Sequence, residues 1–255
     1  KDELCGGSTQ KAINDKNLSK IDIFLPPLKE QQRIVAKLDA AFAKIDKAIE
    51  HAKLKERNAS NLYDSFLDNA LEKNKKIPLI EACDRITDGS HHSPKTLSNE
   101  FPYITVKDIS DDKIDFNNCK FVSKSFYQEL VQNNCKPSMG DVLFSKDGTV
   151  GKVSLIDYEK DFVVLSSLAI ISANKDIINP RFLYYSLKSK SFINEAIGKK
   201  TGAAIRRIIL KTLKNIKISI PELDEQDRLI SVLDKFTIEH EKLNSSLKLK
   251  VLNLH

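Results

Sequence analysis

The chain has 255 residues, of which 41% are hydrophobic and 30% charged, and its formal net charge at pH 7 is +6. This composition is typical of a folded protein with one or two domains and excludes a disordered tail, while the small positive charge only hints at an acidic partner. No apolar run approaches the roughly 18 residues of a membrane span, so we expect a cytoplasmic protein with no membrane partner.

The first long element is predicted between Leu28 and about Lys73. Apolar residues recur there at alternating spacings of 4 and 3, the pattern of a heptad seam. The seam, on which only Lys55 and Asn69 are polar, consists of Ile34, Leu38, Ala41, Ile45, Ala48, Ala52, Lys55, Ala59, Leu62, Phe66 and Asn69. Its regularity favours a left-handed coiled coil, roughly 65–70 Å long at about 1.5 Å per residue.

The segment that follows has the pattern of a mixed, mostly β domain. Short apolar runs separated by turn residues predict strands between 106 and 122 and again between 142 and 171. Between Pro180 and Ala196, apolar and aromatic residues at helical spacing predict one or two short helices.

The start of the long helix occurs twice. Residues 18–34 (LSKIDIFLPPLKEQQRI) reappear without a gap at 213–229 (LKNIKISIPELDEQDRL), 195 positions later. Each copy predicts a short alternating strand that ends at proline, followed by a helix with a glutamate, Glu30 or Glu225, in its first turn. One such segment would be an ordinary helix start. Two in register indicate an internal duplication on either side of one larger domain.

These two segments resemble the conserved regions of the specificity (S) subunits of type I restriction-modification systems, and the segment between them resembles that family's target recognition domain. Three further motifs occur in the family's order: Asp88-Gly89-Ser90-His91, Gly140-Asp141-Val142-Leu143 and Gly148-Thr149-Val150-Gly151. The resemblance covers nearly the whole chain. It departs from the family order of domain, helix, domain, helix, because only the tail of a first domain is present. We therefore expect either part of a longer protein or a natural half-size form that completes itself as a homodimer.

The predicted fold class is α+β, with a mixed, mostly β target recognition domain flanked by two long helices that form an antiparallel coiled coil. Both helices join the same domain at one end, so we expect the alanines of the first helix to face large residues of the second: Leu229, Leu233, Phe236, Leu243 and Leu247. The predicted parts are the tail of a first recognition-domain-like segment (1–27), a conserved long helix (28–76), the target recognition domain (77–223) and a second conserved helix (224–255).

We predict no catalytic site, metal site or cofactor in this chain. It has no Walker A loop, no G-x-G-x-x-G and no methyltransferase signature, and Cys5, Cys83, Cys119 and Cys135 lack zinc-site spacing. We expect reduced thiols instead. The resemblance implies that the chemistry belongs to partners: methyltransferase (M) subunits that use S-adenosylmethionine, and a restriction (R) subunit that uses ATP and Mg²⁺.

The resemblance also implies that the chain binds double-stranded DNA, reads one half of a bipartite target and positions the methyltransferase subunits. The candidate base contacts are polar residues near the motifs: Ser90, His91, His92, Lys95, Lys107, Ser145, Lys146 and Lys152. The candidate phosphate contacts are a basic run, Lys199, Lys200, Arg206, Arg207 and Lys211. Lysine-rich runs are more often solvated faces, but the resemblance favours phosphate contact. The alternative function is a coiled-coil adaptor with a β-rich protein-binding head.

Overall fold

The structure, a computed structural model, describes residues 15–71, 75–92, 98–198 and 207–252. The chain separates into two compact units. One contains the described residues up to Leu54 and from Leu249, and the other runs from Lys55 to Lys248. Within the described ranges, no helix is long and apolar enough to cross a lipid bilayer.

The first unit contains α1 (Asp15–Leu18) and the N-terminal part of α2 (Leu28–Leu71), a helix of 44 residues. Gln31 fastens the helix start, since its side-chain amide donates a 2.7 Å hydrogen bond to the carbonyl of Pro26. The alternating residues before the helix form no strand: residues 21–27 are extended but have no strand partner among the described residues. The predicted first strand is therefore wrong for this chain, because a strand needs a neighbour for its hydrogen bonds.

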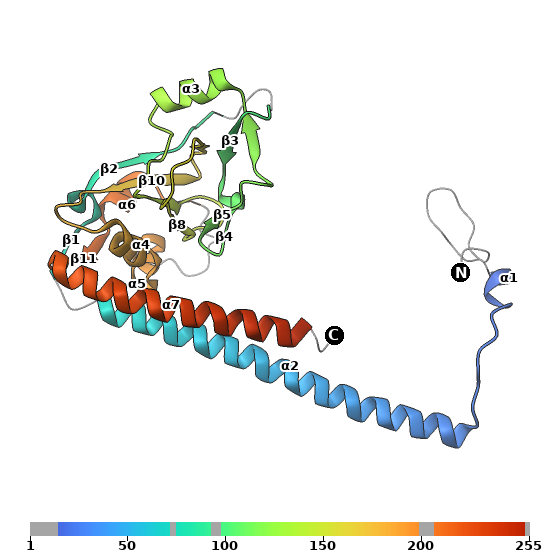
Figure 1. The fold of residues 1–255 in the computed structure, drawn as a ribbon. Helices are drawn as coiled ribbons and strands as arrows, with labels where there is room; N and C mark the ends of the chain where they lie inside the picture. Colours follow the sequence, from blue (N-terminus) through green and yellow to red (C-terminus); the bar gives the residue numbers. More distant parts are fainter. Residues whose placement is uncertain (1–14, 72–74, 93–97, 199–206, 253–255) are drawn as a thin grey trace. The chain divides into compact units, whose positions relative to one another are not determined.

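In the second unit, the C-terminal part of α2 packs antiparallel against α7 (Leu223–Leu252), which runs beside it (Figure 1). The ring of Tyr63 stacks on His240 with centroids 4.8 Å apart, and Phe66 lies 4.7 Å from Phe236. Residue numbers thus fall along α2 as they rise along α7. The predicted antiparallel pairing is confirmed for this stretch.

The predicted seam is only partly right in the same stretch. Tyr63, Leu67 and Leu71 are buried, whereas Leu62, a predicted seam residue, is exposed. The buried face is rotated because α2 packs here against more than one helix. Its Asp64 also pairs with Lys190, with Nζ 2.8 Å from Oδ2, at the start of a short helix of the domain.

In the described part of the domain between the two long helices, the strands form four sheets. The largest sheet is antiparallel, in the order β2 (Cys83–Asp88), β10 (Leu168–Ala173), β7 (Asp141–Ser145) and β8 (Val153–Leu155). A second sheet has the order β6 (Lys120–Val122), β3 (Phe101–Ile104) and β9 (Val163–Val164), of which β3 and β9 are parallel. Two-stranded sheets are β4 (Ile109–Ser110) with β5 (Lys113–Ile114), and β1 (Lys76–Pro78) with β11 (Lys217–Ser219).

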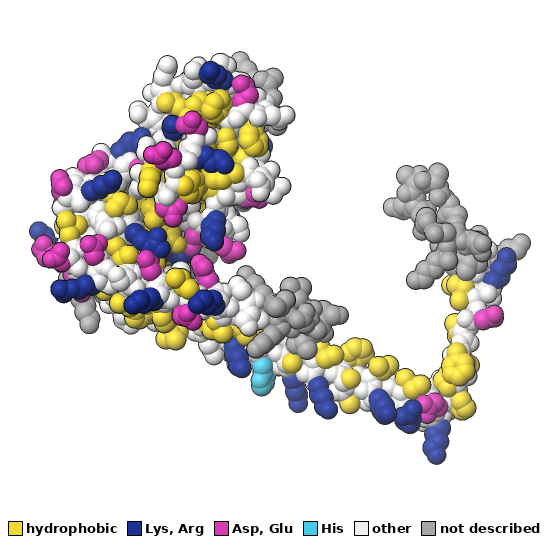
Figure 2. Space-filling model, in the orientation of Figure 1, with side chains coloured by type: hydrophobic (Ala, Val, Ile, Leu, Met, Phe, Trp, Pro, Cys, Tyr) yellow, Lys and Arg dark blue, Asp and Glu magenta, His cyan; other side chains and the backbone are white. Residues whose placement is uncertain are grey.

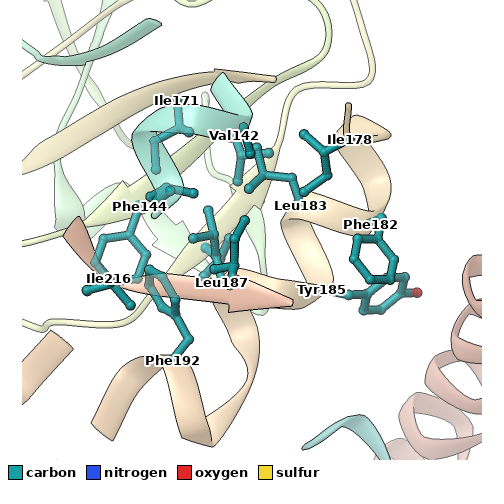
Figure 3. Close-up of a cluster of buried hydrophobic side chains, with 14 of the residues drawn as sticks. Val142, Phe144, Ile171, Ile178, Phe182, Leu183, Tyr185, Leu187, Phe192 and Ile216 are labelled. Carbon is teal, nitrogen blue, oxygen red and sulfur yellow. The ribbon is translucent and has the colours of Figure 1, made fainter. Parts of the chain in front are cut away.

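Short helices cover the largest sheet. The one or two short helices predicted here are two: α4 (Pro180–Lys188), capped by the Asn179 side chain, and α5 (Lys190–Ile197), capped by Ser189. Their apolar faces bury Leu187 and Phe192 against Phe144 of β7, in the cluster of Figure 3. The remaining helical segments are η2 (Leu79–Ala82), η3 (Val106–Asp108), α3 (Lys124–Gln132) and α6 (Leu210–Asn215).

The second copy of the repeat is covered by this domain, whereas the first copy is exposed within its own unit. β11 pairs with β1, and Ile216 and Ile218 are only 3% and 4% exposed. Their equivalents, Ile21 and Ile23, are 44% and 77% exposed. Hydrophobic side chains also gather over the N-terminal part of α2, as the yellow atoms of Figure 2 show. The two copies thus have the same sequence pattern in different surroundings.

The helix start itself is built in the same way in both copies. Gln226, the equivalent of Gln31, donates to the carbonyl of Pro221 at 2.9 Å, as Gln31 does to Pro26. Gln226 also donates to the carbonyl of Ile177 at 2.9 Å and accepts the backbone N–H of Asn179 at 2.8 Å. The duplication is therefore structural, and the domain adds further bonds to the second copy.

Candidate nucleic-acid interface

The candidate site is a group of loops that lie against one another beyond the ends of β2 and β7. The backbone N–H of Ser90 donates to Val164 at 2.8 Å, and that of Ser166 donates to Ser90 at 2.8 Å. The N–H of Lys146 donates to Ser167 at 2.9 Å. These main-chain bonds fasten the segments after β2 and β7 to the turn before β10.

Gly89 permits the closest of these contacts. A Cβ at this position would lie 2.3 Å from the carbonyl oxygen of Val164 and 2.5 Å from that of Leu165. No side chain fits at such distances, and the atoms it would meet belong to the backbone. The glycine of the Asp-Gly-Ser-His motif is therefore required for the approach of the two segments.

Ser90 shapes the turn that carries two exposed histidines. Its hydroxyl donates to the carbonyl of His92 at 2.8 Å and accepts the N–H of the same residue at 3.1 Å. The Tyr103 hydroxyl donates to that carbonyl too, at 3.0 Å. Ser90 is consequently buried, while His91 and His92 face solvent. His91 remains tied to the motif, with Nε2 3.3 Å from Oδ2 of Asp88.

Lys146 is a buried cation at the centre of the loops. Its side chain is 1% exposed, and its Nζ lies 3.1 Å from Oδ1 of Asp88. Its carbonyl accepts the backbone N–H of Ile208 at 2.7 Å. Lys146 therefore joins the segment before α6 to the loops after β2 and β7.

Lys152 and Ser145 also bond inside the site. The Ser145 hydroxyl donates to the carbonyl of Thr149 at 2.6 Å and accepts the N–H of Lys152 at 2.7 Å. The Lys152 ammonium donates to the carbonyls of Val106, at 3.0 Å, and Ile109. This ties the loop after β7 to the segment that carries the exposed Lys107.

The predicted DNA contacts fall into three groups. Four of them, Lys95, Lys199, Lys200 and Arg206, lie outside the described residues. Five are exposed: His91, His92, Lys107, Arg207 and Lys211. The other four, Ser90, Ser145, Lys146 and Lys152, are buried or half-buried and bonded within the protein. In this conformation Ser90, Ser145 and Lys146 offer almost no surface to a base.

Sequence reasoning missed the partners that hold these loops. Asp88 belonged to a quoted motif, but nothing in the sequence pairs it with Lys146, 58 positions later. Asp147 forms an isolated β-bridge with Arg207, and its Oδ2 lies 4.0 Å from Arg207 Nε. Such contacts depend on tertiary structure and leave no spacing signal in the chain.

The described residues contain no cluster of three or more His, Cys, Asp and Glu side chains that could hold a metal ion. Cys83, Cys119 and Cys135 are free thiols and are buried. Burial, with a smaller contribution from the negative charge of Asp84, raises the pKa of Cys83 to about 12. A thiol with so high a pKa is a poor nucleophile and a poor metal ligand at neutral pH.

The fold defines a class: an α+β protein in which a duplicated helix start precedes and follows one mixed domain with clustered loops in the sequence. The model of a known family, the type I restriction modification DNA specificity domain, matches residues 1–56 and 68–251. The chain belongs to this family. The two matched segments each contain one copy of the helix start.

Similar proteins carry the same description. The chain is 28% identical to a protein of Haemophilus influenzae assigned as a type I restriction enzyme specificity subunit, over 96% of this chain and 63% of that protein. It is 22% identical to the specificity subunit of the type I restriction enzyme EcoBI of Escherichia coli, over 87% of this chain and 52% of that protein. The chain thus spans less than two thirds of either relative.

A solved structure of a type I restriction-modification system shares the fold. The TM-score is 0.73 with 23% identity, and the match covers 97% of this chain and 62% of the other. At this identity the likeness concerns the fold alone, and it confirms the predicted α+β architecture with its two long helices.

Proposed function

We propose that the chain is a DNA-recognition and scaffold subunit that reads one half of a bipartite target and positions methyltransferase subunits. Membership of the DNA specificity domain family over both repeats and the domain between them carries this proposal. Methylation with S-adenosylmethionine, and cleavage with ATP and Mg²⁺, would belong to separate M and R subunits. The chain would act in the cytoplasm, where those partner subunits meet DNA. A protein-binding adaptor would leave the family match unexplained.

The exposed residues of the loops are the proposed DNA contacts. His91, His92 and Lys107 have the hydrogen-bonding groups to read base edges in the major groove. Arg207 and Lys211 are exposed cations near the other end of the basic run and would contact phosphates. Lys199, Lys200 and Arg206 keep their predicted phosphate role in this proposal.

The uncovered first repeat supports a second recognition domain in the assembly. Ile21, Ile23 and Leu38 are exposed, although their equivalents in the second repeat are buried under strand β1 and the neighbouring elements. We propose that another recognition domain covers them, either in the same polypeptide or in a second copy of the chain. Each domain would then read one half-site.

Replacing Lys199, Lys200, Arg206 and Arg207 with alanine tests the phosphate role. The substituted chain should bind all duplexes more weakly, and the slope of log K against log salt should fall by roughly 0.9 for each phosphate that the chain no longer neutralises. Sequence preference should survive, because phosphates carry no sequence information. Fluorescence anisotropy at several salt concentrations measures both quantities. A collapse of the preference with an unchanged slope would contradict the assignment.

Deleting the seven residues Ala48 to Leu54, with a matching deletion in the partner helix, tests the spacer role. The heptad register survives, and each helix shortens by about 10 Å at ~1.5 Å per residue. At ~3.4 Å per base pair, the gap between half-sites should shrink by about 3 base pairs, unless DNA bending absorbs the change. Mapping methylated sites with the complete assembly measures the gap. An unchanged gap in an active assembly would show that the helices do not set the distance.

A further inference from the structure

We propose that Asp88 and Lys146 form a positioning pair, which holds the DNA-reading loops in place and orients His91 without contacting DNA. This inference rests on the proposed function. It assigns to Lys146 a role different from the base contact that its sequence position suggested.

Lys146 connects four segments that are distant in sequence. Its N–H donates to Ser167 and its carbonyl accepts from Ile208, while its side chain reaches Asp88 at the end of β2. Lys146 itself follows β7. The exposed His91, Arg207 and Lys211 lie within a few residues of these bonded positions. A shift of the lysine would move all of these segments relative to one another.

The burial of Lys146 argues against a phosphate contact. Its side chain is 1% exposed, and its charge is balanced by Asp88, whose side chain is 17% exposed. A phosphate would have to displace this carboxylate and open the loops to reach Nζ. Burying two charges costs solvation free energy that their attraction recovers only in a well-fitted geometry. Asp88 Oδ1 has no hydrogen-bond partner among the described residues, so the attraction between the two charges at 3.1 Å is the interaction that favours this arrangement of the loops.

Asp88 also connects the buried pair to an exposed side chain, that of His91. Its Oδ1 faces Lys146, and its Oδ2 lies 3.3 Å from Nε2 of His91, whose side chain is exposed. A carboxylate beside Nε2 favours a proton on that nitrogen. In the neutral ring, Nδ1 is then the acceptor that remains for a base. The pair would thus fix both the place of the imidazole and the nitrogen that it presents.

The test uses the full chain with Lys146→Met, Asp88→Asn and the double substitution. Selection from a duplex pool with a random central region first identifies the preferred sequence of the wild-type chain. Affinities for that duplex and for a scrambled duplex are then measured at several salt concentrations. Lys107→Met is the matched control for an exposed lysine of the same loops, and Lys235→Met is the control for an exposed lysine of α7.

Lys146→Met should lower the preference for the selected duplex by about tenfold, the size of a typical mismatched base pair. Affinity for the scrambled duplex and the salt slope should stay unchanged. Asp88→Asn should have a similar effect, and the double substitution should be no worse than either alone, because the residues act as a unit. Lys107→Met, by contrast, should change the affinity for DNA through the loss of a direct contact. Lys235→Met should change neither the affinities nor the salt slope. Lys146→Arg, which keeps the charge, should recover part of the preference.

Two results would overturn the pairing. One is a fall of about 0.9 in salt slope with equal weakening of both duplexes in Lys146→Met, which would make Lys146 a phosphate contact. The other is an additive loss of sequence preference in the double substitution, which would mean that Asp88 and Lys146 act independently. If Lys146→Met shows no cooperative thermal unfolding, the double substitution replaces it, since it leaves no unpaired buried charge.

A failure of the proposed function is distinguishable from a failure of the pairing. The first would appear as a wild-type chain that selects no sequence. Hydrogen exchange still tests the pairing in that case: the amides of Ser90, Ser166 and Ile208 should exchange faster in Lys146→Met, while those of β7 and β10 stay protected. Unchanged exchange at all three amides would refute the proposal.

Discussion

Leu233→Ala should lower the free energy of unfolding by about 2–5 kcal/mol, because the side chain is fully buried and its removal leaves a cavity. Leu233 lies in α7 and belongs to the main core cluster of the larger unit. The loss should appear as a lower denaturant midpoint with an unchanged m-value, measured by circular dichroism.

The repeat supplies a matched control in the same chain. Leu38 is the equivalent residue of the first copy, also leucine in a long helix, and is 49% exposed where Leu233 is 0% exposed. Leu38→Ala should therefore change the stability of the isolated chain by no more than about 0.5 kcal/mol. Equal costs at the two positions would show that the first repeat is already covered in solution. An assembly that supplies the missing cover should make Leu38→Ala costly as well.

Gly89→Ala should be the most damaging single change in the candidate interface. The added Cβ would meet two backbone oxygens, at 2.3 and 2.5 Å, and neither can turn aside as a flexible side chain would. Overpacking against fixed backbone should cost on the order of 3 kcal/mol, near the upper end of such effects. The loop after β2 should separate from residues 164–166, and sequence preference on DNA should be lost with it.

Gly140→Ala separates steric overlap from backbone strain. Gly140 has φ of +93°, which alanine adopts only with strain, but its nearest neighbour would lie 3.8 Å from an added Cβ. Its cost should be about 1–2 kcal/mol, less than that of Gly89→Ala, and DNA preference should remain. Thermal unfolding followed by near-ultraviolet circular dichroism measures the stability cost, and duplex binding measures the DNA preference. A harmless Gly89→Ala would mean that the two loops do not touch in solution.

The sequence predicted the parts of the fold that depend on local pattern. The two long helices, the strand Lys217–Ser219 and the short helices after Pro180 follow from periodicity, proline stops and capping residues. The exposed face of α2 was harder to predict. Leu62 fits a heptad, yet the helix turns Tyr63 and Leu67 inward because it packs against helices of the domain as well as α7.

The candidate site shows a second limit of prediction from sequence. Lysines near a motif attract a DNA-binding interpretation, because charge is visible in sequence and burial is not. Lys146 is buried and paired with Asp88, and the Lys152 ammonium donates to two carbonyls of a distant segment. His91 and His92 were predicted as polar residues near a motif that contact bases, and they are exposed. Exposure could be anticipated for residues in a turn, but the internal bonds could not.

The shared hydrogen bond of Gln31 and Gln226 also bears on how such chains can be recombined. In both copies a proline precedes the helix, and the glutamine five residues after it donates a hydrogen bond to its carbonyl. The two copies lie in one register, 195 residues apart. A crossover that joined the first copy to the second at equivalent residues would therefore rebuild a complete helix start. Removing or adding a whole domain in this way leaves no frayed helix and no shifted heptad. We therefore expect a chain recombined at the duplicated segment to keep both helix starts intact while one domain replaces another.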